Sequence, residues 1–112
     1  MAYDEALAER VRSVLADRQD VSEQKMFGGI AFMVGGRMAV GVTGNELMVR
    51  VGPDAHDAAL SRPHVRPMDF TGRPMRGFIS VAPGGVADEG DLARWVEEGA
   101  VFAATQPAKP RR

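Results

Sequence analysis

The sequence predicts an α+β fold with two layers, in which an antiparallel sheet of four to five strands packs against helices. Amphipathic 3.6-residue periodicity occurs near both ends of the chain, and alternating apolar residues occupy its middle. The strands also follow one another instead of alternating strictly with helices, which favours an antiparallel sheet. The expected order is α-β-β-β-α-β(β)-α. With 112 residues, of which 45% are hydrophobic and 26% charged, the chain is expected to form a single globular domain.

The first helix is expected over residues 4–17. Its apolar residues, Leu7, Val11, Val14 and Leu15, fall on one stripe of a 3.6-residue period. Acidic side chains stand in the first turn, where the positive end of the helix dipole favours them. The stripe therefore predicts a helix that packs one face against the sheet.

Residues 25–51 change to a two-residue period and predict a three-stranded antiparallel meander. Gly35-Gly36 is a strong hairpin signal because glycine adopts the positive φ angles of tight turns, and Gly44 marks a second turn. One face of such a sheet is apolar, so the helices must cover it. The three strands are expected at residues 26–34, 38–42 and 46–51.

A short helix is expected over residues 54–60, because Pro53 suits the first turn of a helix. Residues 61–77 contain three prolines and Gly72, which predicts a loop with no long regular element and a short extended piece at 68–70. A further strand is expected at 77–81.

The last helix is expected over residues 88–105, with Asp88 as its N-cap. Gly99 is unfavourable inside a helix and therefore indicates a close approach to the sheet or a bend. Residues 1–105 are expected to form the domain. Residues 106–112 contain two prolines and three basic side chains and are expected to be a disordered basic tail.

The residue inventory predicts no catalytic residues, no metal site and no cofactor, so the chain is expected not to be an enzyme. It contains no cysteine and only two histidines, which are not spaced as metal ligands and are interpreted as surface residues. Gly28-Gly29 does not form a phosphate-binding loop and is interpreted as a bulge or a close backbone approach. An acidic N-terminus without a long apolar run predicts a cytoplasmic protein with no membrane partner.

The net charge of −1 conceals an uneven distribution. Residues 1–24 carry −3 and residues 77–106 carry −4, whereas residues 50–76 carry +2. Arginine suits phosphate and carboxylate groups, so the basic segment is a candidate anion- or partner-binding surface. The alternative is a solvated loop whose arginines pair with the acidic helices. The candidate binding residues are Arg50, Arg62, Arg66, Arg73 and Arg76.

Four segments resemble the TfoX N-terminal domain family, also called TfoX/Sxy, in order and at fitting spacing. They read KMFGG at 25–29, MAVGV at 38–42, LMVRVG at 47–52 and PMDFTGRPM at 67–75. The resemblance spans residues 3–105 and implies a two-layer α+β fold and an association with bacterial regulators of competence for DNA uptake. Those regulators carry a second, helical C-terminal domain, so this chain is expected to be a stand-alone N-terminal domain. The family brings no catalytic residues to this sequence.

The leading functional hypothesis is a non-enzymatic regulatory or protein-interaction module, linked through the resemblance to transcription or competence regulation. Its expected partner is another protein, contacted through residues 62–76. One alternative is a nucleic-acid-associated accessory protein, which the acidic helices disfavour. Another is a small anionic-ligand binder that uses the same basic loop. A homodimer is also considered, because a small sheet often has a free edge.

Overall fold

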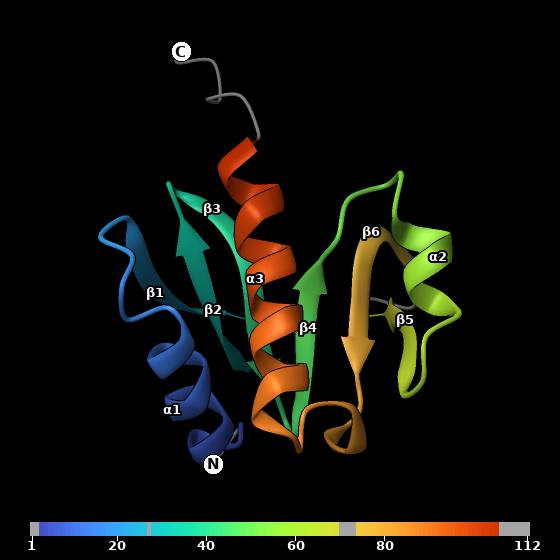
Figure 1. Cartoon of the computed structure of the whole chain (residues 1–112), viewed down its shortest axis with the longest axis horizontal. Helices are drawn as coiled ribbons and strands as arrows, with labels where there is room; N and C mark the ends of the chain where they lie inside the picture. The colour runs from blue at the N-terminus through green and yellow to red at the C-terminus, as the bar shows by residue number, and fades with distance from the viewer. Residues whose placement is uncertain (1–2, 27, 70–73, 106–112) are drawn as a thin grey trace.

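The computed structural model of the chain describes residues 3–26, 28–69 and 74–105. Within these residues, one open antiparallel sheet of six strands is combined with three α-helices (Figure 1), which confirms the predicted α+β class. The strands lie in the order β1-β2-β3-β4-β6-β5. In chain order the elements are α1 (Glu5–Val14), β1 (Val21–Met26), β2 (Gly29–Val34), β3 (Arg37–Thr43), β4 (Glu46–Arg50), α2 (His56–Leu60), β5 (Val65–Asp69), β6 (Pro74–Val81), the 3₁₀ turn η1 (Pro83–Gly85) and α3 (Glu89–Thr105).

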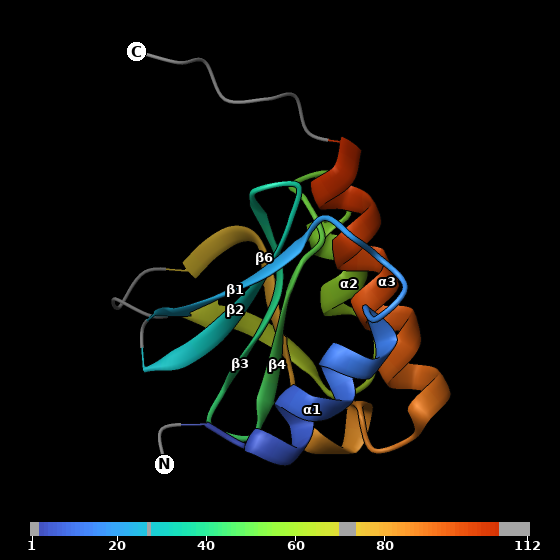
Figure 2. The ribbon, with the colours of Figure 1, turned by 90° about the vertical axis from the view of Figure 1, so that its left-hand side faces the viewer.

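The helices lie together on one side of the sheet, so the molecule has the two predicted layers (Figure 2). α3 crosses the central strands β3 and β4, α1 lies beside it, and α2 covers β5 and β6. Alternate residues of the central strands point into this core, where Phe32, Val49 and Ile79 are fully buried. Leu92 and Val96 of α3 meet them from the helical layer. Burial of this apolar surface is what holds the two layers together.

α1 forms where the apolar stripe predicts it, although it ends at Val14 instead of residue 17. Asp4 is its N-cap, because its Oδ1 accepts a hydrogen bond from the backbone N–H of Leu7 at 3.1 Å. Arg12 joins the helix to β1 by donating from Nε and Nη2 to the two oxygens of Glu23, at 2.6 and 2.9 Å. The hydrogen bond to Glu23 raises the pKa of Arg12 above its ordinary value.

The predicted meander is present as β2, β3 and β4, and Gly35 and Gly36 turn the first hairpin with φ angles of 61° and 83°. The predicted close approach at Gly29 is confirmed, since an added Cβ would collide with the carbonyl oxygen of Val42. The expected count of four to five strands is wrong, because β1 precedes the meander. β1 carries exposed polar residues over 22–25, and an edge strand needs no apolar alternation to pair with its one neighbour.

The segment 61–77, expected as a loop with a short extended piece at 68–70, contains the strand β5 and the start of β6. β5 lies at the outer edge of the sheet and pairs with β6, with Pro67 opposite Ile79. A proline is tolerated there because an edge strand leaves one row of backbone groups unpaired. The prolines therefore mark an edge strand in this segment, and they do not exclude regular structure.

α3 begins as predicted, since Asp88 Oδ2 accepts hydrogen bonds from the backbone N–H groups of Gly90 and Asp91 at 2.9 and 3.1 Å. The predicted close approach at Gly99 is confirmed, because an added Cβ would collide with the carbonyl oxygen of Ala39 in β3. Gly99 therefore sets how closely α3 sits on the sheet. Among the described helices, none combines the length and the apolar character that a membrane crossing requires.

Candidate functional site

The predicted binding residues are spread over three parts of the fold. Arg62 lies in the connection between α2 and β5, Arg66 lies in β5, and Arg50 ends β4. Arg73 lies outside the described residues, as does the tail 106–112, which was expected to be disordered and basic. Arg76 has its backbone in β6, but its side chain is outside the described part of the structure.

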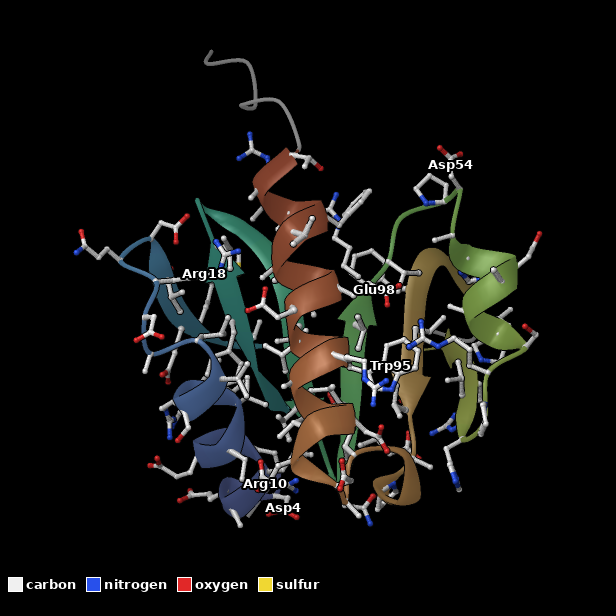
Figure 3. The ribbon with its side chains drawn as sticks, in the orientation of Figure 1. Asp4, Arg10, Arg18, Asp54, Trp95 and Glu98 are labelled. Atoms are coloured by element: carbon white, nitrogen blue, oxygen red, sulfur yellow. The ribbon has the colours of Figure 1, made fainter. Side chains whose placement is uncertain are left out.

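Arg62 lies against α3. Its guanidinium carbon is 3.7 Å from the centroid of the Trp95 ring, and its Nη1 donates to Glu98 Oε1 at 2.9 Å. Trp95 and Glu98 project from the side of α3 that faces β6 and α2 (Figure 3). The Arg62 side chain remains 41% exposed, whereas Trp95 is buried. The stack fixes the plane of the guanidinium, and the side chain as a whole remains in contact with solvent.

Arg66 is on the other face of the sheet. Val65, its neighbour in β5, faces the helical core, so Arg66 points away from it. Its Nη2 donates to Glu46 Oε1 at 2.5 Å, and Ser80 Oγ donates to the same oxygen at 2.7 Å. Arg66 is thus neutralised by a partly buried carboxylate from β4.

Arg50 has an aromatic environment. Its guanidinium carbon is 5.7 Å from the Phe78 ring centroid and 5.4 Å from that of Phe102. Both distances are within the range of a cation–π interaction. Among the arginines whose side chains the structure describes, Arg50, Arg62 and Arg66 therefore have three different environments. Arg50 and Arg62 both contact α3, whereas Arg66 lies on the other face of the sheet.

A cleft of about 330 Å³ opens beside Arg62, between the connection that precedes β5, the turn η1 and the first half of α3. His64 forms part of its wall with φ 67°, the left-handed region that residues other than glycine rarely adopt. The His64 carbonyl accepts a hydrogen bond from Ala82 N at 2.8 Å, which fixes this conformation against η1. The lining residues are Arg62, Pro63, His64, Gly84, Gly85, Asp91 and Trp95.

The imidazole of His64 rests on Gly84. A Cβ added to Gly84 would stand 2.9 Å from Cε1 and 3.1 Å from Nδ1 of the ring, so only glycine leaves room for it. His64 is exposed, as its interpretation as a surface residue predicts. The cleft therefore presents to a ligand the hydrogen-bond donors of Arg62 and the imidazole of His64. Asp91, which also lines the cleft, offers a carboxylate that can only accept hydrogen bonds when ionised.

The prediction of two surface histidines is wrong for His56. This residue begins α2 and is only 6% exposed, and its Nδ1 accepts a hydrogen bond from the backbone N–H of Gly77 at 3.0 Å. Gly77 lies within β6 and has a positive φ of 91°, and its backbone N–H is the donor to His56. Within the described residues, no group of three or more histidine, aspartate or glutamate side chains is arranged to hold a metal ion.

Sequence reasoning identified Arg62 but missed the residues that make a site around it. In the sequence, Trp95 belongs to the apolar stripe of the last helix, and Glu98 is one of several acidic residues in that helix. A tryptophan and a glutamate at i and i+3 share one side of a helix, so this spacing was the available signal. Which segment lies against that side depends on contacts 33 or more residues apart in sequence, which periodicity does not report.

Comparison with known proteins identifies the family. The TfoX N-terminal domain matches residues 13–103, which is most of the chain. No curated protein and no solved structure matches the chain. The matched span runs from the last residues of α1 to the final turn of α3 and includes the cleft and all five predicted arginines. The chain therefore belongs to the TfoX N-terminal domain family.

Proposed function

We propose that the chain is a non-enzymatic regulatory module that works by binding another protein, with the surface around Arg62 as its contact site. The observation that carries this proposal is the stack of Arg62 on Trp95 at the rim of an open cleft. Arginine and tryptophan are the residues that most often dominate the binding energy of protein interfaces. A guanidinium that is already ordered also loses less conformational freedom when a partner binds.

The family supports a regulatory or competence-related role, and the TfoX N-terminal domain is not a known enzyme family. A link to transcription or competence regulation in a bacterial cytoplasm is part of the proposal. The surface is mixed in charge, since Arg62 pairs with Glu98 and Arg94 pairs with Asp91 nearby. Mixed charge suits recognition of a protein better than recognition of a nucleic-acid backbone, which needs an excess of cations.

The test is affinity capture from a lysate of the source cells, quantified by mass spectrometry. The wild-type chain is compared with Arg62→Gln, with Arg66→Gln on the opposite face of the sheet, and with Arg18→Gln as a matched control. Arg18 pairs with Asp20 at 4.0 Å and lies on the far side of α3 from Trp95 (Figure 3). We expect a specific partner that Arg62→Gln loses and that Arg18→Gln and Arg66→Gln retain.

Identical partners for all four proteins would contradict the proposed contact site. Binding of DNA or RNA that weakens steeply with salt would contradict the proposed class, since that dependence is the mark of phosphate contacts. Circular dichroism of each variant establishes that a lost partner reflects a lost contact and not a lost fold.

A further inference from the structure

The guanidinium of Arg62 is only partly used by the fold. Nη1 donates to Glu98, and among the described residues this is the only hydrogen bond of the Arg62 side chain. One face of the guanidinium plane covers Trp95. Nε and Nη2 have no hydrogen-bond partner among the described residues, and their two parallel N–H groups match the two oxygens of one carboxylate.

His64 supplies a second available group. Neither of its ring nitrogens hydrogen-bonds to a described residue, although the ring is held in place against Gly84 and Gly85. Its left-handed backbone is fixed by the hydrogen bond to Ala82. Residues held in rarely populated backbone conformations cluster at ligand-binding positions, because the surrounding fold must maintain the strain.

The acidic residues next to the cleft limit which anion can enter. Asp91 lines it, and Glu98 stands at its rim on Arg62. Asp91 accepts a hydrogen bond from Arg94 Nη2 at 3.2 Å, so each of these carboxylates is balanced by one arginine. A ligand carboxylate must therefore share Arg62 with Glu98, and a group with a single negative charge meets the least repulsion from Asp91 and Glu98. A doubly charged phosphate would meet two nearby like charges and is disfavoured.

We propose that this cleft receives a single glutamate or aspartate side chain from an exposed segment of the protein partner. The carboxylate pairs with the Nε and Nη2 edge of Arg62 and accepts a further hydrogen bond from the imidazole of His64. A volume of about 330 Å³ holds this side chain together with part of the neighbouring chain. This inference rests on the proposed function, because it names the chemistry that the partner presents to the same site.

Trp95 provides a direct probe, because it is the only tryptophan in the chain and lies beneath Arg62. The ligand is a short peptide, free of tryptophan and blocked at both ends, that contains a single glutamate among serines. It is titrated at low ionic strength while Trp95 emission is followed. The matched peptide has glutamine in place of the glutamate, and inorganic phosphate is titrated separately. We expect the glutamate peptide to produce a saturable change in Trp95 emission. We expect the glutamine peptide to bind with an affinity at least about tenfold lower.

Three variants locate the binding. Arg62→Gln is expected to weaken glutamate-peptide binding by about tenfold or more, and Arg18→Gln is expected to leave it unchanged. Gly84→Ala displaces the imidazole of His64 while leaving Arg62 and Trp95 in place, and it is expected to weaken binding less than Arg62→Gln does. Because Arg62→Gln also alters the surroundings of Trp95, calorimetry provides a second measurement of affinity for every protein.

Equal affinity for the two peptides, or unchanged binding by Arg62→Gln, would overturn the inference. So would tighter binding of inorganic phosphate than of the glutamate peptide. If affinity capture depends on Arg62 but the glutamate peptide does not bind, the carboxylate inference is wrong and the proposed function stands. If the peptide binds through Arg62 but captured partners do not depend on this residue, the cleft binds a carboxylate, but the proposed contact site is wrong, and so is the inference that the partner supplies that carboxylate.

Discussion

The guanidinium of Arg62 stacks on the ring of Trp95 with 3.7 Å between the guanidinium carbon and the ring centroid, across a separation of 33 residues in the chain. Such a contact stabilises by about 0.5–1 kcal/mol at an exposed site, and by more when water is excluded. It also determines the direction in which the remaining N–H groups point. The flat face of the Arg62 guanidinium is thereby held against Trp95, while its Nε and Nη2 have no partner among the described residues.

The pair Arg62–Glu98 is expected to contribute little to stability. Both side chains are partly exposed, at 41% and 33%, and exposed ion pairs typically contribute about 0.2–1 kcal/mol. A double-mutant cycle with Arg62→Ala and Glu98→Ala, measured by urea unfolding, should give a coupling energy in that range. A coupling well above about 1 kcal/mol would show that Arg62 is mainly a structural residue.

His56 is expected to stabilise the fold through one hydrogen bond. Replacing it by leucine removes the acceptor for the buried N–H of Gly77, which costs about 1–3 kcal/mol in the free energy of unfolding. His56→Asn keeps an acceptor near the position of Nδ1 and should recover part of this loss. The measurement is urea unfolding followed by circular dichroism. Leucine and asparagine variants of equal stability would show that the hydrogen bond contributes nothing.

Arg10 is expected to hold α1 to the start of α3. Its Nη2 donates to the carbonyl oxygens of Val86 and Ala87 at 2.7 and 3.1 Å, and its Nε donates to Glu89 at 2.9 Å. Arg10→Met keeps the apolar stem and removes these bonds, so we expect a loss of about 1–3 kcal/mol.

Glu89→Gln is the control for Arg10, because Glu89 is 74% exposed and its charge should change stability by less than about 1 kcal/mol. Thermal unfolding of the three proteins separates the carbonyl contacts from the ion pair. If Arg10→Met has the melting temperature of the wild type, the hydrogen bonds from Arg10 to the carbonyl oxygens of Val86 and Ala87 do not stabilise the packing of α1 against the start of α3.

Gly99→Ala is expected to destabilise the protein even though alanine favours helix. The added methyl group would collide with the backbone of Ala39, and overpacking of this kind costs about 1–3 kcal/mol. The matched control is Gly90→Ala in the first turn of the same helix, where the nearest atom is a carboxylate oxygen of Asp88 at 3.0 Å. Urea unfolding should give a much lower free energy of unfolding for Gly99→Ala than for Gly90→Ala. The reverse order would contradict the close contact between α3 and β3.

The class of the fold could be predicted because its central elements have strong local signals. The stripe in α1, the glycine turn at Gly35 and the alternation in β3 and β4 each depend on a few adjacent residues. β1 and β5 have no such signal, because edge strands carry polar residues or prolines. Their pairing is determined by the neighbouring strand, and the sequence of the edge strand itself does not report it.

The site was less predictable than the fold. Composition identified an arginine-rich segment, but adjacent β-strand residues point to opposite faces of a sheet. Arg66 is consequently on the opposite face from the helices, while Arg62 lies on the helical side because it precedes the strand. The burial of His56 likewise depends on the position of β6, which lies 21 residues further along the chain at Gly77.

The position of α3 also has a consequence for synthesis. This helix is the last described element of the chain, yet it covers β3 and β4 at the centre of the sheet. While the chain is still on the ribosome, the inner faces of these strands therefore remain uncovered until residues 89–105 have emerged. Unpaired apolar surface of this kind promotes aggregation and attracts chaperones. The interval between the emergence of β4 and the emergence of α3 is thus a period in which the apolar faces of the central strands lack their helical cover.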